Sequence, residues 1–517
     1  MHNLMVPPGL LSGGFSQATM IQRLPAIDPV RHVLLEAPLV RDRQGDSLQR
    51  QLLARIRNAI LDGRFPSGCR LPGSRDLAAD LGVSRNSVTA VYEQLGAEGY
   101  IELSRRGTKV SALDRSRARG HADPARAAPP RLSERSAQVV SRFADAGETL
   151  AFRPGVPALA RFPLSAWKSC FDRAFKASGV SALGYGNPAG EAALQGAIMR
   201  HLAVARGVRC EAGQVVITEG AQEALNLCVR LVANPGDTAW VEDPGYRGAQ
   251  TAFQCGDLKV EALRVDGAGL VVPADAWTAA PPRLIYTTPS HQYPTGGVLP
   301  VARRLALIRQ AQACGAWIIE DDYDSEFRHA GELIGAMQGL VPEAPVMYVG
   351  TFSKTLFPSL RLGFVVLPQA LAAVAAPLLR ETLRGGHRHE QLALAEFIES
   401  GQFSRHLGRM RRLYRSRQAL LRDALAQHLA VPHGVQGGDS GMHLTVRLPP
   451  EYPDQAIADA ARAYDMAPAP LSRFALRAQP EDNGLVLGYG NTSESQYPAL
   501  VQRLSRLAQA QRARRSA

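Results

Sequence analysis

The sequence has few cysteines and no long apolar run, and both shortages narrow the class of protein. Its six cysteines are widely spread, and no two of them form a Cys-x-x-Cys pair. Neither a zinc site nor a disulfide framework is therefore indicated. No stretch of about 18 uninterrupted apolar residues is present, which argues against a membrane span. The first residues lack the basic start and apolar core of a secretory signal, so we expect a cytoplasmic protein with reduced thiols.

What the chain does have is an excess of positive charge on an ordinary globular composition. Hydrophobic residues make up 45% and charged residues 21% of the 517 residues, and the formal net charge is +12 at pH 7. This length favours more than one domain. The positive balance favours polyanionic partners, but it indicates nucleic acid only if the chain also holds a motif that binds it.

The first periodic segment begins at Leu48. Residues 1–45 mix proline, glycine and apolar residues without a period, so we predict an irregular segment there. From Leu48 to Ile60 an apolar residue recurs at every fourth position with arginines between, which predicts a helix with a basic face. Gly63 and Pro66 end this helix.

Two further helices and a hairpin follow in the sequence. The patterns are those of helices over 74–81 and 84–98, separated by a glycine turn, and of short strands over 100–103 and 108–112. Ser84 is a suitable N-cap for the third helix. Three helices, a short turn and a two-stranded tail predict a winged helix-turn-helix domain over residues 46–112.

The start of the third helix carries side chains suited to DNA. Guanidinium, amide and hydroxyl groups in the first turn of such a helix read base edges or hold phosphates. The residues that offer these groups are Ser84, Arg85, Asn86 and Ser87, with Arg105 and Arg106 at the tip of the wing. The alternative is an ordinary polar surface helix.

The composition changes after this domain. Residues 113–145 are rich in alanine, arginine and proline with no apolar period, which predicts a flexible basic linker. Within 146–517, apolar runs typical of strands alternate with helical patterns. This alternation predicts an α/β domain with a mainly parallel sheet and helices on both faces. The strand candidates are 215–218, 238–241, 284–287, 316–320, 347–349 and 362–367.

One lysine of the second domain stands in a pattern with specific chemistry. Lys354 follows an apolar strand and the residues Gly-Thr-Phe-Ser, and Arg361 comes shortly afterwards. A lysine in this position suits an imine with the aldehyde of pyridoxal 5′-phosphate (PLP). Ser353, Thr351 and Arg361 would bind and neutralise the phosphate. An ordinary surface lysine is the alternative.

Supporting groups follow three other strands of the predicted sheet. Asp321 lies at the end of an apolar run, where a carboxylate would keep the pyridine nitrogen protonated. Residues 220–222 open a helix whose backbone N–H groups would hold a phosphate. Tyr246, after a turn, would stack on the ring, although a core tyrosine is the alternative.

The acids around Asp321 leave a second interpretation open. Asp324, Glu326 and His329 lie close by in the sequence, and carboxylates with a histidine are metal ligands. We expect no metal, because the neighbouring motifs favour PLP.

Motifs from both domains resemble one known family. The segments LPGSRDLA, LGVSRNSV, VYEQLGAEGY and GTKV resemble the GntR-type winged helix, and EDPGY, TPSHQYPTG, EDDYDSEF, GTFSKTLFPSLRLGF and LVLGYGN resemble the fold-type I aminotransferase domain of the MocR/GabR subfamily. These matches span nearly the whole chain. The resemblance implies a transcription regulator in which a winged helix-turn-helix is fused to a PLP-binding, aminotransferase-like α/β domain.

The resemblance also implies roles for individual residues. Lys354 would form the imine, Asp321 would pair with the pyridine nitrogen, and Tyr323 would donate to the phenolic oxygen of PLP. Tyr246 would stack on the ring, and Gly220, Ala221, Gln222, Ser353 and Arg361 would hold the phosphate. Arg473 would grip a carboxylate, or equally a sulfonate, of an effector. Tyr185 would reach the phosphate in the partner subunit of a homodimer, and Arg75, Arg85 and the wing near Gly107 would contact DNA.

The sequence departs from aminotransferases at one pocket position. Tyr293 stands before Pro-Thr-Gly, where those enzymes have an asparagine that touches the cofactor. We therefore expect His291 or Gln292 to line the pocket differently, and we expect weakened transaminase turnover.

Two functions are consistent with these features. In the first, the PLP domain of a regulator senses an amino acid, an amine or a B6 vitamer, and its two reading heads bind double-stranded promoter DNA. In the second, the chain is an active PLP-dependent aminotransferase with an accessory DNA-binding module. The fused winged helix favours the regulator.

Overall fold

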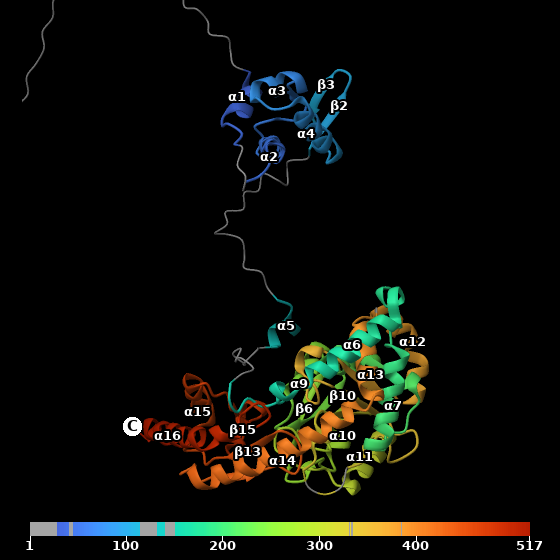
Figure 1. The fold of residues 1–517 in the computed structure, drawn as a ribbon, viewed down its shortest axis with the longest axis vertical. Coiled ribbons are helices and arrows are strands. Elements are labelled where there is room, and N and C mark those ends of the chain that lie inside the picture. Colours follow the sequence, from blue (N-terminus) through green and yellow to red (C-terminus); the bar gives the residue numbers. More distant parts are fainter. Residues whose placement is uncertain are drawn as a thin grey trace, which may run out of the picture. The chain divides into compact units, whose positions relative to one another are not determined.

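The chain folds into two compact units, residues 1–131 and residues 132–517, each around an apolar core of its own (Figure 1). The computed structural model describes residues 28–40, 45–113, 132–139, 150–329, 331, 334–383 and 385–516. Among these residues, no helix combines the length and the apolar character that crossing a lipid bilayer requires.

The first unit joins three main helices to a small sheet (Figure 1). The helices are α2 (Leu48–Leu61), α3 (Ser74–Leu81) and α4 (Arg85–Ala97), and the sheet has the order β1–β3–β2 with strands Arg70–Leu71, Gly107–Val110 and Ile101–Ser104. Gly82 ends α3 with a φ of 65°, a left-handed conformation that glycine adopts without strain. The backbone N–H of Ser87 donates to Ser84 Oγ (3.1 Å) and caps α4. The predicted winged helix-turn-helix is confirmed.

The segment before α2 is not irregular throughout. Helix α1 (Pro29–Leu35) begins after Asp28, whose Oδ1 accepts the N–H of Val30 (3.0 Å). Val30 and Leu34 lie one turn apart and are buried in the core that α2 also lines. The prediction of an irregular 1–45 is wrong over this helix, because a single apolar pair gives no detectable period and tertiary packing stabilises so short a helix. Residues 1–27 and 41–44 lie outside the described part.

The linker prediction falls mostly on residues outside the described part. Residues 132–139 are described and contain α5 (Glu134–Gln138), which belongs to the second unit. There Arg135 forms an ion pair with Asp257 (2.9 Å). The second unit therefore begins before the predicted boundary at residue 146.

An eight-stranded sheet is the frame of the second unit, with the order β4–β11–β10–β9–β8–β5–β6–β7. The strands are β4 (Val215–Thr218), β5 (Thr238–Asp243), β6 (Lys259–Asp266), β7 (Gly269–Leu270), β8 (Leu284–Thr287), β9 (Trp317–Asp322), β10 (Val346–Thr351) and β11 (Gly363–Val366). From β10 to β6 all neighbours are parallel, whereas β11 and β7 run antiparallel to theirs. The predicted α/β class and the mainly parallel sheet are confirmed.

Helices cover both faces of this sheet. Helices α8 (Ala221–Val232), α9 (Arg247–Cys255) and α12 (Gln369–Thr382) pack on one face, and α7 (Ala192–Arg206) and α11 (Val301–Cys314) pack on the other. Helix α13 (Arg388–Glu399) contacts both α7 and α6 (Leu164–Ser178), and α10 (Ala276–Ala279) is a single turn. Along β9, Ile319 joins the core under α8 and Ile318 the core under α11, as expected for a strand buried on both faces.

A second, smaller lobe follows in the sequence. Its antiparallel sheet has the order β12–β13–β15–β14 with strands Gly434–Gln436, His443–Arg447, Gly484–Gly488 and Ala469–Pro470. Helices α15 (Asp454–Ala461) and α16 (Tyr497–Ser516) pack with it, and the long α14 (Gln402–His428) precedes it (Figure 1). We call residues 434–516 the small lobe and the eight-stranded sheet with its helices the large lobe.

The packing of α1 predicts a stability difference between two neighbouring leucines. Leu34 is fully buried in the first unit, whereas Leu35 is 43% exposed. Leu34→Ala should lower the free energy of unfolding of this unit by about 2–5 kcal/mol, because it leaves a cavity in the core. Leu35→Ala should change it by less than about 0.5 kcal/mol. Urea denaturation of the full chain checks this, and equal effects of the two variants would contradict the packing of α1.

Candidate functional site

The first turn of α4 presents four of the residues predicted to contact DNA. Arg85 and Asn86 are exposed on it. The hydroxyls of Ser84 and Ser87 lie 2.8 Å from each other across the cap, with Ser84 exposed and Ser87 half-buried. A helix N-terminus combines unpaired N–H groups with a positive dipole end, which attracts phosphate.

The remaining predicted DNA contacts are also on the surface of the first unit. Arg75, in the first turn of α3, and Arg105, between β2 and β3, are both exposed. The hairpin turns at Gly107 with a φ of 117°, and Ser104 Oγ donates to the Gly107 carbonyl (2.9 Å). The unit thus carries exposed cationic side chains on both its helices and its wing.

A cavity of about 340 Å³ opens in the second unit at the ends of its strands. Residues that follow the carboxyl ends of β4, β5, β8, β9 and β10 line it, as expected for a ligand site of a parallel sheet. The lining residues are Pro154, Gly155, Ala221, Gln222, Tyr246, Tyr286, Tyr293, Asp321, Tyr323, Asp324, Thr351, Ser353, Lys354, Pro358, Arg361, Met442 and His443. Nine of the residues predicted from the sequence to bind a cofactor are among them.

Lys354 lies just after β10 with its amine at this cavity. Its Nζ donates to the carbonyl of Gly155 (2.8 Å), a residue far away in the sequence. A Cβ at position 155 would lie 2.9 Å from that nitrogen, so the absence of a side chain there gives the amine its room. The geometry keeps a primary amine at a half-buried position inside the cavity.

Asp321, near the end of β9, is the buried acid of the cavity. Its Oδ2 accepts the hydroxyl of Tyr286 (2.7 Å), and its Oδ1 has no hydrogen-bond partner among the described residues. Burial raises the pKa of Asp321 to about 7, although the hydrogen bond from Tyr286 and the charge of Lys354 act in the opposite direction. A buried oxygen without a partner is costly, and it is ready to accept an N–H or N⁺–H donor from a ligand.

Groups suited to bind an anion lie together at the start of α8. Gly220 precedes the helix with a φ of 86°, and Ala221 and Gln222 begin it at the cavity. The Arg361 guanidinium donates to the carbonyl of Glu219 (2.7 Å) and would lie 3.3 Å from a Cβ at position 220. Gly220 is not among the lining residues itself, but its lack of a side chain brings the guanidinium against the helix start. Together these groups suit a phosphate.

Aromatic rings line another side of the cavity. The ring of Tyr246 lies 6.5 Å from that of Tyr286 and 6.1 Å from that of Tyr293. Tyr293 is also in edge contact with Tyr323 (5.6 Å). The Tyr323 hydroxyl donates to the carbonyl of His291 (3.0 Å). Burial raises the pKa of Tyr246 to about 12, so the Tyr246 hydroxyl stays protonated at neutral pH.

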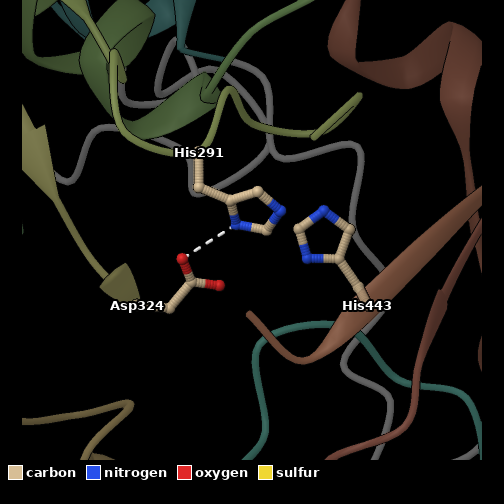
Figure 2. A group of neighbouring side chains, drawn as sticks. All are labelled: His291, Asp324 and His443. Atoms are coloured by element: carbon tan, nitrogen blue, oxygen red, sulfur yellow. Dashed lines mark hydrogen bonds and ion pairs between the residues drawn. The ribbon is translucent and has the colours of Figure 1, made fainter. Parts of the chain in front are cut away.

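Two histidines and Asp324 form a buried cluster beside the tyrosines (Figure 2). His291 Nδ1 lies 2.9 Å from Asp324 Oδ1. His443 Nε2 lies 3.0 Å from the carbonyl of Pro294, and burial lowers the pKa of His443 to about 3, so His443 is neutral. These hydrogen bonds involve one ring nitrogen of each histidine, whereas His291 Nε2 is buried without a hydrogen-bond partner among the described residues.

His291 and Gln292 do not line the cavity, although the sequence predicted that one of them would. Neither is among the lining residues of the cavity, because both are buried behind it, where Gln292 Nε2 donates to Glu242 (3.2 Å). Asp324 and His443 line the cavity instead. The metal interpretation proposed Asp324, Glu326 and His329 as ligands. Among the described residues, the structure instead places Asp324 near His291 and His443, and the possible ligand atoms of these three lie within 4.8 Å of one another.

Besides Gly220, the predicted residues Tyr185 and Arg473 lie outside the cavity lining. Tyr185 is 92% exposed in the loop before α7. The Arg473 guanidinium, in the small lobe, donates to Gln455 Oε1 (2.6 Å) and pairs with Asp459 (3.6 Å). The structure thus brings the predicted lysine, acid and phosphate ligands together, but it does not bring these two residues to them.

Sequence reasoning missed six lining residues: Pro154, Gly155, Tyr286, Pro358, Met442 and His443. Tyr286 is the most consequential, because it holds one oxygen of Asp321. The sequence does show a tyrosine within the apolar strand 284–287. Its contact with Asp321 can be recognised only from the strand order, which places β8 beside β9.

Comparisons with known proteins match both units. The description "Bacterial regulatory proteins, gntR family" matches residues 48–110, and "Aminotransferase class I and II" matches residues 157–475. The chain is 39% identical over 458 residues to the probable rhizopine catabolism regulatory protein MocR of Rhizobium meliloti, covering 87% of this chain and 92% of the relative. The chain belongs to the MocR-type family of GntR regulators. The resemblance inferred from its motifs is confirmed.

Other relatives of this MocR-type chain are also named regulators. The regulator TauR of Rhodobacter capsulatus is 33% identical, with 89% of this chain and 96% of the relative covered. The pyridoxine biosynthesis regulator PdxR of Corynebacterium glutamicum is 31% identical, with coverage of 87% and 93%. The chain is therefore a transcription regulator by family, which confirms the regulatory role in the first of the two functions considered.

Solved structures share the fold of the second unit alone. A multiple substrate aminotransferase from Thermococcus profundus superposes with a TM-score of 0.67 at 24% identity, covering 74% of this chain and 98% of that one. LysN, an α-aminoadipate aminotransferase from Thermus thermophilus, superposes with a TM-score of 0.64 at 26% identity, covering 74% and 96%. This fold family is PLP-dependent.

The burial of Asp321 predicts a pH-dependent stability in the cofactor-free protein. Because its pKa rises from 3.8 to about 7 on folding, the folded state binds the proton more tightly and loses stability as the pH rises through this window. Asn cannot ionise, so Asp321→Asn does not lose this stability. The difference in unfolding free energy between Asp321→Asn and wild type should therefore increase between about pH 4 and pH 7, by on the order of 2–4 kcal/mol, and stay constant at higher pH.

Urea denaturation at a series of pH values measures this difference. Asp275→Asn, which changes an exposed carboxylate, is the control and should show no such growth. A gain for Asp321→Asn that does not vary with pH would contradict the buried, proton-binding acid.

Proposed function

We propose that this chain is a transcription regulator that holds PLP in the cavity of its second unit, senses an amine-bearing effector there and binds promoter DNA through its first unit. The observation that carries the proposal is one cavity that holds a lysine amine and a buried carboxylate oxygen without a partner. Its family membership supplies the regulatory role.

The residues present fit the chemical groups of PLP. Asp321 Oδ1, which has no hydrogen-bond partner in the part of the chain that the structure describes, suits a protonated pyridine nitrogen, which the raised proton affinity of the site favours. The start of α8 and Arg361 suit the phosphate, and the ring of Tyr246 suits a stacked pyridine. When bound, PLP supplies an aldehyde that combines with amines and a ring that withdraws electrons. Lys354 holds the amine that would combine with it.

The effector would be an amino acid, an amine or a B6 vitamer. An effector with an amine would take the place of the Lys354 amine on the cofactor, and Arg473 would bind its carboxylate or sulfonate if it has one, whereas an aldehyde vitamer would combine with the Lys354 amine itself. Arg473 now pairs with Gln455 and Asp459, so it would have to leave those partners. A ligand that binds one arrangement of the domain more tightly shifts the population toward it, which is how the cavity would influence DNA binding.

A homodimer completes the proposal. Tyr185 is 92% exposed, and Val180 and Leu183, which lie shortly before it in the chain, are 82% and 70% exposed. Large apolar side chains grouped on a surface mark a protein interface. In such a dimer Tyr185 would reach the phosphate in the partner subunit, and two DNA-binding units would address two half-sites in cytoplasmic DNA.

An active aminotransferase is the second candidate. The complete set of lysine, acid and phosphate ligands and the likeness to solved aminotransferases favour it. Tyr293 occupies the position before Pro-Thr-Gly and fills part of the cavity wall with a half-buried ring. Sustained keto-acid formation from an amino donor would favour the enzyme, whereas a single turnover or none would favour the regulator.

The proposal predicts the loss of a spectroscopic signal. PLP-saturated wild-type protein should absorb visible light, and Lys354→Ala should abolish that absorbance because it removes the amine that combines with the aldehyde. Lys259→Ala, which changes an exposed lysine on β6, should leave the spectrum intact. Absorbance spectra after removal of free PLP decide the matter, and an unchanged spectrum of Lys354→Ala would refute the assignment.

A second prediction concerns DNA. If Arg85 contacts a base, Arg85→Ala should weaken binding to the promoter of the regulated gene by ~1–3 kcal/mol. Arg64→Ala removes the same charge at a site where the guanidinium pairs with Glu36 and Asp62, so it should bind nearly as the wild type does. Electrophoretic mobility shifts at fixed salt measure both variants, and equal binding by all three proteins would remove Arg85 from the interface.

A further inference from the structure

The segment 472–477 of the small lobe is bound from both lobes. It contains Arg473, the predicted effector ligand, and Phe474, whose ring is in edge contact with Tyr293 of the cavity wall (5.2 Å). Whatever holds this segment therefore sets the position of Phe474 against the wall residue Tyr293, and the position of the adjacent Arg473.

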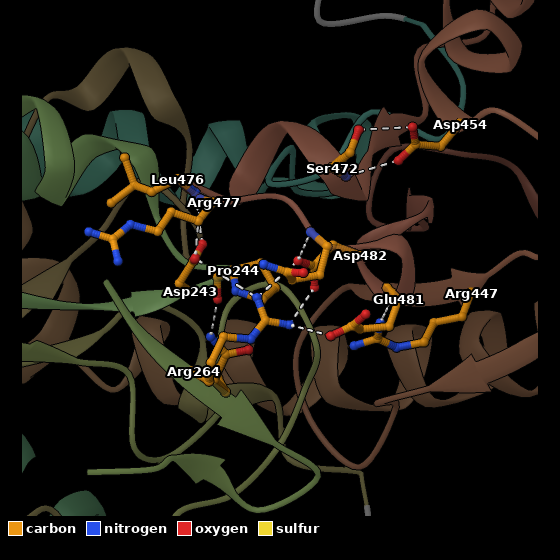
Figure 3. Close-up of polar contacts among 12 residues, drawn as sticks. Asp243, Pro244, Arg264, Arg447, Asp454, Ser472, Leu476, Arg477, Glu481 and Asp482 are labelled. Carbon is orange, nitrogen blue, oxygen red and sulfur yellow. Dashed lines mark hydrogen bonds and ion pairs between the residues drawn. The ribbon is translucent and has the colours of Figure 1, made fainter. Parts of the chain in front are cut away.

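On the small-lobe side, Asp454 fixes the start of the segment. Its two carboxylate oxygens accept the backbone N–H of Ser472 (2.9 Å) and the Ser472 hydroxyl (2.8 Å) (Figure 3). Asp454 is also buried. This anchor belongs to the same lobe as the segment and would move with it.

On the large-lobe side, the end of β5 binds the rest of the segment. Asp243 accepts the consecutive N–H groups of Leu476 (2.8 Å) and Arg477 (3.3 Å). The N–H of Gly245 donates to the Phe474 carbonyl (3.0 Å), and Arg247 donates to the Arg473 carbonyl (3.0 Å). These four bonds cross from one lobe to the other.

Arg264 on β6 joins the same two lobes through its guanidinium (Figure 3). It binds both oxygens of Asp482, in the small lobe, at 2.9 and 3.0 Å, and it lies 3.8 Å from Asp243. The side chains of Asp482 and Asp243 are 0% and 1% exposed. One cation thus faces two buried carboxylates, and its removal would weaken the charge compensation of both. We call Asp243, Arg264 and Asp482 the clasp.

We propose that the clasp is a positioning device that holds segment 472–477 against the cavity and thereby sets how well Arg473 recognises a carboxylate-bearing ligand. This inference rests on the proposed function, since it takes the cavity as the site of the cofactor and of an amine-bearing ligand. Guanidinium recognition of a carboxylate depends on the placement of a planar fork. If the segment were held from one lobe alone, the planar guanidinium of Arg473 would occupy many positions.

The first arm of the test needs no cofactor. Hydrogen–deuterium exchange of the cofactor-free full chain should be faster over 472–477 in Asp243→Asn, because the amide of asparagine can accept only one of the two N–H groups. Arg264→Met should act in the same direction, and Arg264→Lys, which keeps the charge, should restore part of the protection. The control is Asp266→Asn, which breaks an Asp266–Arg303 pair (2.7 Å) within the large lobe. Unchanged exchange in Asp243→Asn and Arg264→Met would overturn the proposal.

The second arm measures carboxylate recognition with two general reagents for PLP. Hydroxylamine and aminooxyacetate each replace the C=N bond to Lys354 by an oxime and release the lysine amine, but only aminooxyacetate has a carboxylate. Asp243→Asn should slow the aminooxyacetate reaction by about tenfold or more, the loss expected for one misplaced charged hydrogen bond. It should leave the hydroxylamine rate nearly unchanged.

The two arms separate the two proposals. Equal slowing of both reagents would mean general damage to the cavity, and no slowing of aminooxyacetate would mean that the clasp does not serve recognition; either result would overturn the inference. If wild-type protein takes up no PLP, the proposed function fails and carboxylate recognition falls with it. The exchange experiment still decides, in that case, whether the clasp holds the segment.

Discussion

A buried carboxylate with one unpaired oxygen, facing a lysine amine across a cavity, is the constraint on which the rest of the second unit depends. Burying a carboxylate is unfavourable unless other groups bind it, and the described residues give Asp321 only the Tyr286 hydroxyl on one oxygen. The parallel sheet makes this pairing unavoidable, because β9 and β10 end at the same edge and deliver Asp321 and Lys354 there. A cationic ring nitrogen would supply the missing donor and relieve the cost.

The fold followed from the sequence wherever the pattern was long or strongly periodic. The helix at 74–81, the Ser84 cap and six of the eight strands of the large sheet lie where the sequence predicts them, whereas β6 and β7 were not among the strand candidates. Helix α1 escaped prediction because its only buried residues, Val30 and Leu34, are stabilised by a core that the local sequence does not reveal. The strand order of the sheet also needed the structure, since residues in β4 and β11 become neighbours only through long-range pairing.

The candidate site was predictable where one motif carries the chemistry. The motifs around Lys354, Asp321 and Arg361 predicted an imine-forming amine, an acid for the pyridine nitrogen and a phosphate ligand. All three residues line one cavity. Tyr286, Gly155 and His443 could not be predicted, because each acts through a neighbour distant in sequence, as Gly155 does by accepting from Lys354. The bonds of Asp243 and Arg264 to the small lobe likewise join segments more than 200 residues apart.

The central claim is a covalent link between PLP and one side chain, and reductive trapping tests it most directly. Protein saturated with PLP is treated with borohydride, digested and examined by mass spectrometry. The account predicts a pyridoxyl adduct on the peptide that contains Lys354. Colourless protein without that adduct, or with the adduct on another lysine, would contradict it.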